Sequence, residues 1–154
     1  MKIIFILMFF SLKLYSQINT DMSEVRLLYI KSVSEYKSCL KLDSITKQFS
    51  KEKFPILYSY NISSFLLSCN HIKNPIKKYA IFKQKSKDLD NIIIENPNSI
   101  EIRFLRYMIQ SNAPQFLGYD TKIDSDYNFV LDNLNRIDKS LKEFIFDLIN
   151  KQKI

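Results

Sequence analysis

Glycine occurs only once in this chain of 154 residues, at Gly118, and proline occurs four times. Tight turns between β-strands usually need glycine or an Asn-Gly pair, because two-residue hairpin turns require positive φ angles. Neither Asn-Gly nor Asp-Gly is present, and the prolines instead divide the chain into pieces of helix length. The sequence therefore predicts an all-α fold of five to six helices whose short links make them antiparallel neighbours.

Hydrophobic periodicity and capping residues give the approximate bounds of these helices. Asp21 and Glu24 fit a capping box at the start of the first helix. Asp138 either begins a separate last helix or lies inside a continuous one. The expected helices run from Asp21 towards Phe49, from Pro55 to about residue 69, from Pro75 to about residue 95, from Asn98 or Ser99 to about residue 111, and from Asp124 or Ser125 towards the C-terminal end.

The N-terminal segment, residues 1–16, has the pattern of a secretory signal peptide. Lys2 precedes an unbroken apolar run, and the segment ends at the small residue Ser16. The run is shorter than the about 20 residues that a transmembrane helix needs, and no later run is long enough. We therefore expect cleavage after Ser16, one helical domain over residues 17–154, and export to the periplasm or the cell exterior. The alternative is an anchor helix that is never cut.

Residues 101–119 (EIRFLRYMIQSNAPQFLGY) place two arginines in an otherwise apolar run. On a helix that begins near residue 100, the polar side chains fall on one arc, opposite a broad apolar arc. We call this arc the arginine stripe: Arg103, Arg106, Tyr107 and Gln110. The stripe is the candidate partner-binding surface, because arginine suits a carboxylate or peptide partner. The alternative is that the arginines pair with buried acids across a helix interface, such as partners of Glu101 or Asp120.

Pro114 and Gly118 are expected to form the turn that ends this helix. Proline does not continue a helix comfortably, and glycine takes a positive φ without the cost that a Cβ atom adds. The large side chains around this glycine, Phe116, Leu117 and Tyr119, are expected to point into the core and hold the loop. Glu101 is expected to pair with a lysine of the third helix.

Residues with obvious catalytic or metal-binding chemistry are few. His71 is the only histidine, and with Cys69 it supplies two potential ligands, fewer than a structural zinc site needs. The chain has no glycine-rich phosphate loop and no Gly-x-Ser-x-Gly motif. Asp124 and Asp126 look like helix-capping residues. The sequence therefore predicts no catalytic residue, no metal and no cofactor.

Cys39 and Cys69 are the only cysteines, and an exported protein meets an oxidising environment. If the first two helices fold back near residue 52, the two cysteines are offset by about four residues, or roughly 6 Å along the axis. A disulfide needs Cα atoms within about 7 Å of each other. The sequence leaves open a disulfide or two buried free thiols.

The stretch IIIENPNSIEIRFLRYMIQSNAPQFLGY and the following KIDSD resemble a group of small, uncharacterised secreted proteins of Bacteroidota. The resemblance covers most of the expected mature chain and is specific over residues 92–126. It implies helical hairpins similar to those of tetratricopeptide repeats, although Lys85 and Arg106 stand where such repeats usually have small or apolar residues. It implies no particular function.

Three classes of function are compatible with these features. The favoured one is a non-enzymatic binding or scaffold protein of the cell envelope, whose partner is another envelope protein or a peptide. The alternatives are a carboxylate-based hydrolase and a basic protein associated with a membrane surface, since the net charge is +7. Export makes nucleic acid an unexpected partner, and the oligomeric state is open.

Overall fold

The computed structural model describes residues 20–152, so the expected signal peptide lies outside the described residues. Within this range the chain forms seven α-helices and three short 3-10 helices, and no strand. The all-α prediction is confirmed, with seven helices in place of the five to six expected. The elements are α1 (Met22–Ser32), α2 (Tyr36–Thr46), α3 (Pro55–Ser68), η1 (Cys69–His71), α4 (Pro75–Glu95), α5 (Ile100–Asn112), η2 (Gln115–Leu117), α6 (Ile123–Asp132), η3 (Leu134–Arg136) and α7 (Lys139–Gln152).

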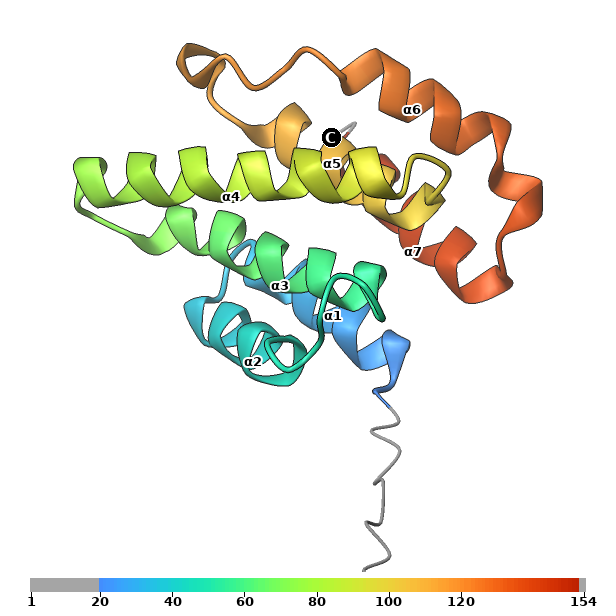
Figure 1. The fold of residues 1–154 in the computed structure, drawn as a ribbon, viewed down its shortest axis with the longest axis horizontal. Helices are drawn as coiled ribbons and strands as arrows, with labels where there is room; N and C mark the ends of the chain where they lie inside the picture. Colours follow the sequence, from blue (N-terminus) through green and yellow to red (C-terminus); the bar gives the residue numbers. More distant parts are fainter. Residues whose placement is uncertain (1–19, 153–154) are drawn as a thin grey trace, which may run out of the picture.

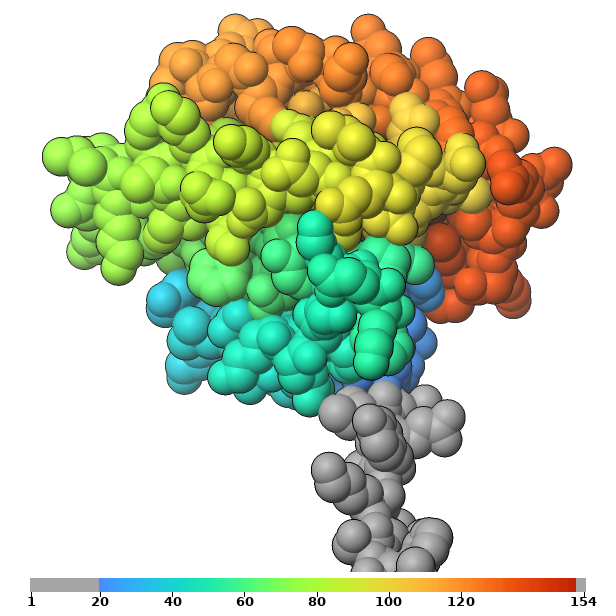
Figure 2. Space-filling model, viewed as in Figure 1, coloured from blue at the N-terminus to red at the C-terminus, as the bar shows by residue number. Residues whose placement is uncertain are grey.

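The longest helix, α4, crosses the middle of the molecule, with α1, α2 and α3 on one side and α6 on the other (Figure 1). The space-filling view shows α4 as a continuous band between the N-terminal helices and the segment that carries α6 (Figure 2). Helix α3 packs on α1, α2, α4 and α5, while α5 also packs on α4 and α6. Helices α3 and α5 therefore form the centre of the fold.

Helix α5 is enclosed on almost all sides. Between Ile100 and Gln110, every side chain is buried except Arg103 and Tyr107, which are half-buried. The apolar side reaches α7, where the rings of Phe104 and Phe144 lie 5.7 Å apart. A helix with a polar stripe usually turns that stripe to solvent. In this fold α4 and α6 cover the stripe, so its arginines contact these two helices.

The prediction of a single helix from Asp21 towards Phe49 is wrong, because the helix is interrupted between α1 and α2. In a continuous helix the Ser32 carbonyl would accept from the amide four residues later. Here it accepts from the Cys39 thiol at 3.3 Å, and His71 Nε2 also lies 3.3 Å away. Ser32, Val33 and Ser34 at the break have lower helix propensity than alanine or leucine. Side chains from α2 and η1 thus bond to the carbonyl that a backbone amide would satisfy in a continuous helix.

Most other helix starts follow the predicted local chemistry. The Asn74 side chain accepts from the amides of Ile76 and Lys77 at 3.0 Å, and Pro75 follows at the first helical position. Asp138 accepts from the Leu141 amide at 2.9 Å, so a separate last helix begins here. Three more helices begin where the sequence predicted: α1 after Asp21, α3 at Pro55 and α5 after Ser99. Glu24 pairs with Lys41, not with the Asp21 backbone.

The turn after α5 has the predicted glycine conformation but not the predicted packing. Gly118 has φ 60° and ψ 30°, and its amide donates to the Gln115 carbonyl at 2.9 Å. Phe116 is 86% exposed, so its expected inward orientation is wrong. Leu117 and Tyr119 are half-buried. The Tyr119 hydroxyl donates to the Ser86 carbonyl at 3.3 Å, which ties the turn to α4.

Replacing Gly118 with alanine is expected to destabilise the fold by about 1–2 kcal/mol through backbone strain alone. A Cβ atom at this position meets no other atom within 4 Å, so steric crowding contributes nothing. Gly118→Asn should cost less, because asparagine tolerates the left-handed region better than alanine. Urea unfolding of both variants measures the difference. Equal stability of the alanine variant and the natural protein would contradict this account of the turn.

Candidate functional site

The two arginines of the stripe converge on one buried carboxylate. Arg103 Nε donates to Asp126 Oδ1 at 2.8 Å, and Arg106 Nε donates to Asp126 Oδ2 at 2.7 Å. A further bond at 3.0 Å joins Arg106 Nη2 to Asp126 Oδ1. Asp126 lies in the first turn of α6 and is fully buried. The carboxylate therefore fastens α6 to α5 through both arginines.

The same network extends to α4. Arg106 Nη1 donates to Asp90 Oδ1 at 3.0 Å, and the Tyr119 hydroxyl, which shares its one proton between this oxygen and the Ser86 carbonyl, lies 3.1 Å from the same oxygen. Burial, followed by the charge of Asp90, raises the pKa of Tyr119 well above its ordinary value. Burial alone lowers the pKa of Arg106, but its bonds to Asp126 and Asp90 outweigh this and raise it. Two cations and two carboxylates balance within this cluster, which joins α4, α5 and α6.

Gln110 also points inward. It is buried, and its Oε1 accepts from the Lys122 amide at 3.2 Å. Tyr107 is half-buried and packs against Tyr127, with ring centres 5.3 Å apart. Of the four stripe residues, only Tyr107 lines the groove described below. The structure thus places Arg103, Arg106 and Gln110 in contacts inside the chain.

The acidic residues that pair with the two arginines are not the ones that the sequence suggested. The arginines pair with Asp126 and Asp90, not with Asp120, and Asp126 is an ion-pair centre and not a cap. Glu101 does not pair with a lysine of α4. Its two oxygens accept from Arg26 at 2.9 and 3.0 Å, and Oε1 accepts from the Tyr60 hydroxyl at 2.7 Å. This second cluster joins α5 to α1 and α3.

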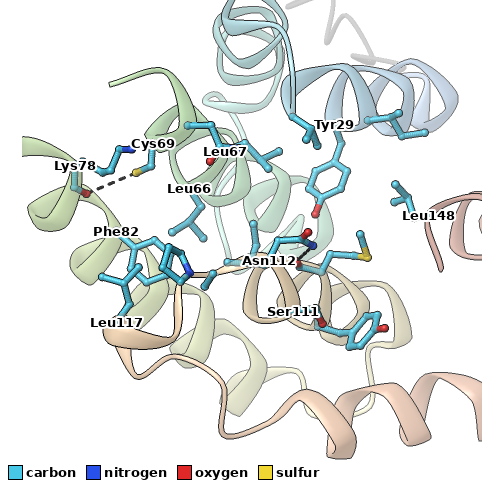
Figure 3. Close-up of a pocket in the computed structure, with 18 of the residues that line it drawn as sticks. Tyr29, Leu66, Leu67, Cys69, Lys78, Phe82, Ser111, Asn112, Leu117 and Leu148 are labelled. Atoms are coloured by element: carbon cyan, nitrogen blue, oxygen red, sulfur yellow. Dashed lines mark hydrogen bonds between the residues drawn. The ribbon is translucent and has the colours of Figure 1, made fainter. Parts of the chain in front are cut away.

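A large apolar groove, which no motif in the sequence indicated, lies at the C-terminal end of α5 (Figure 3). Its volume is about 1200 Å³, and its walls come from α1, α3, η1, α4, α5, η2, α6 and α7. Met108 and Leu66 are among its buried lining residues. Tyr79 and Phe116 also line it, and they are 52% and 86% exposed. The groove thus continues into an apolar rim that faces solvent.

Several polar side chains of the groove wall bond to backbone carbonyls. Ser111 Oγ donates to the Tyr107 carbonyl at 2.7 Å, and Asn112 Nδ2 donates to the Met108 carbonyl at 2.8 Å. The Cys69 thiol lies 3.6 Å from the Lys78 carbonyl oxygen (Figure 3). Most of the residues that line the groove are apolar. Its inner surface is therefore suited to hydrocarbon.

The only charged side chains that line the groove among the described residues are two lysines. Lys78 comes from α4 and Lys151 from α7, and no acidic residue lines the groove within residues 20–152. Neither lysine forms an ion pair with a described residue. In Figure 3, Lys78 and Leu148 lie on opposite sides of the pocket, and Leu148 precedes Lys151 by about one helical turn. The groove thus combines apolar walls with positive charge.

Cys39 and Cys69 are both buried, free thiols, so the disulfide considered from the sequence is absent. Burial raises the pKa of both thiols. A second, smaller pocket of about 420 Å³ lies over the Glu101 cluster and includes Met22 and Asp138 in its lining. Its buried charges already have partners within the chain.

Within residues 20–152, no three His, Cys, Asp or Glu side chains are grouped as a metal site would require. None of the helices in this range combines the length and apolar character needed to cross a bilayer. Comparison of the chain with protein-family models, with curated proteins and with solved structures gave no match.

Proposed function

We propose that this chain is a non-enzymatic binding protein that is exported to the cell envelope, in the periplasm or outside the cell, and that it binds its ligand in the groove at the C-terminal end of α5. The observation that carries this proposal is the groove itself, about 1200 Å³ of mainly apolar lining open to solvent. Concave, mainly apolar pockets are the usual form of small-molecule sites. We also propose that the helices are arranged as antiparallel hairpins similar to those of tetratricopeptide repeats.

The groove supports binding better than the arginine stripe does. Phe116 and Tyr79 line the groove and keep large apolar surfaces in water. Arg106 and Gln110, in contrast, are buried and already bonded within the chain. A partner that used these stripe residues would first have to break their internal bonds. We therefore assign the stripe to stability and the groove to binding.

The alternatives from the sequence have less support. The buried carboxylates of Asp126 and Glu101 are held by arginines and do not line the groove, so this arrangement does not favour carboxylate-based hydrolysis there. A basic membrane-surface protein needs a cationic face, and many exposed lysines of α4 meet that condition. A role at a membrane surface does not account for an apolar groove of about 1200 Å³.

The proposal is tested with a neutral apolar dye, phenylnaphthylamine, whose fluorescence rises in apolar surroundings. We expect saturable binding that falls about tenfold or more in Tyr79→Glu, because the variant places a carboxylate against apolar ligand surface. Ile94→Glu is the matched control, since Ile94 lies on the same helix, is 75% exposed and does not line the groove. Thermal melts confirm that both variants are folded. Equal dye binding by both variants, or none by the natural protein, would overturn the proposal.

A further inference from the structure

We propose that the groove holds a lipid with two acyl chains and a negatively charged headgroup; this inference rests on the groove being the binding site. The acyl chains would lie against the apolar wall around Met108 and Leu66. The headgroup would lie at the solvent-facing edge of the groove beside one of its two exposed lysines, Lys78 or Lys151, which are the only charged residues of the lining among the described residues. Three observations favour this class of ligand over a peptide.

The first observation is that the wall formed by residues 20–152 offers no strand edge, and so no row of main-chain hydrogen-bonding groups, to a peptide. An extended peptide needs main-chain partners, which sheet edges provide in known recognition modes. The described residues contain no strand, and Ser111 and Asn112 already donate to carbonyls of their own helix. Hydrocarbon chains need no such partners. The groove therefore suits acyl chains better than an extended peptide. The sequence alone had favoured another envelope protein or a peptide as the partner, with the arginine stripe as the binding surface.

The second observation is the volume. An apolar cavity of about 150 Å³ holds benzene, which corresponds to roughly 25 Å³ for each carbon atom. Two chains of about sixteen carbons then need roughly 800 Å³, which leaves room for a glycerol unit in a groove of about 1200 Å³. One such chain would fill only about a third of the groove. A partner helix is about 10–12 Å across, so the same volume would enclose only about two of its turns.

The third observation is the charge. Lys78 and Lys151 have no ion-pair partner among residues 20–152, while the other wall residues are uncharged. An ammonium group beside an apolar groove attracts a phosphate or carboxylate at the end of an apolar ligand. A zwitterionic headgroup gains less from the same cation. The proposal therefore specifies a headgroup with a net negative charge.

The test uses the full chain and displacement of phenylnaphthylamine by soluble short-chain lipids. Phosphatidylglycerol with two eight-carbon chains should bind at least tenfold more tightly than its six-carbon counterpart, because each added methylene contributes up to about fourfold. It should also bind more tightly than phosphatidylcholine of equal chain length. Raised salt should reduce that preference, because it screens the lysines. Octanoate, with one chain of the same length, should bind at least tenfold more weakly.

Lys78→Gln isolates the charge contribution. We expect this variant to lose up to about fivefold in affinity for phosphatidylglycerol and to keep its affinity for phosphatidylcholine. Lys87→Gln is the control, since Lys87 is exposed on the same helix and does not line the groove. Both lysines are exposed, so neither change should disturb folding.

The outcomes separate this inference from the proposed function. Dye binding without displacement by either lipid, or displacement only by an acidic amphipathic peptide, would overturn the lipid assignment and leave a groove that binds another class of ligand. Octanoate binding as tightly as the two-chain lipid would overturn the two-chain assignment. Equal affinity for both headgroups in the natural protein would overturn the anionic assignment. A groove that binds no dye would remove the proposed function itself.

Discussion

Asp126→Ala is expected to cost about 3–5 kcal/mol in the free energy of unfolding, the loss typical when one member of a buried ion pair is removed. Asp126 is fully buried and accepts hydrogen bonds from both Arg103 and Arg106. Without it, Arg106 keeps only Asp90 as a carboxylate partner. Small domains are stable by about 5–15 kcal/mol in total. Denaturant unfolding should therefore show a large fall in the midpoint.

Asp124→Ala is the matched control for this experiment. Asp124 also lies in the first turn of α6, so it interacts with the same helix dipole, but it is exposed. Its removal should change stability by no more than about 0.5–1 kcal/mol. If the two variants were equally stable, the network between α5 and α6 would contribute little, and the arginines would again be candidates for partner binding.

Glu101→Ala is expected to have an effect of similar size, about 3–5 kcal/mol. The change leaves the Arg26 guanidinium and the Tyr60 hydroxyl without their shared acceptor, and both side chains are buried. The contact between α1, α3 and α5 depends on this acceptor, so the helices should separate more easily. Chemical denaturation followed by circular dichroism measures the loss.

Glu95→Ala is the matched control for Glu101→Ala, because it removes an ion pair that is exposed and not buried. Glu95 accepts from Lys51 at 2.7 Å, as short as the bonds of Glu101, but both partners are more than two-fifths exposed. Water screens exposed pairs, so this change should cost at most about 1 kcal/mol. A loss in Glu95→Ala equal to that in Glu101→Ala would show that burial of the Glu101 cluster is not what makes it important.

The parts of the fold that depend on local chemistry were predictable. Asn74 with Pro75 and Ser99 begin helices because their caps involve residues within three positions. The break between α1 and α2 was not predictable in the same way. The Ser32 carbonyl is satisfied there by Cys39 and His71, and the latter lies 39 residues away. Contacts over such distances have no periodic signal.

The candidate site was predictable only in part. Spacing identified the arginine stripe as one coherent polar arc, and it left open whether that arc faced solvent or buried acids. The decision depends on where α6 docks, because Asp126 completes the network. The local sequence around Asp126 resembles a helix start, which concealed its role. The groove had no local signal at all, since its walls come from segments between Tyr29 and Lys151.

Methionine methyl groups provide the most direct test of the claim that ligand binds at the C-terminal end of α5. The chain has four methionines. Met108 lines the groove, and Met22 lines the smaller pocket. Met1 and Met8 lie in the N-terminal segment that cleavage after Ser16 would remove, so they report only on the uncleaved full chain. Carbon-13 methyl labels therefore report on each location separately.

We predict that titration of the labelled full chain with phenylnaphthylamine shifts the Met108 methyl signal saturably, because the aromatic ring of the dye lies against that methyl group. The Met22 signal should stay in place. A shift of Met22, or of the N-terminal methionines, with no change at Met108 would contradict the assignment of the groove as the binding site.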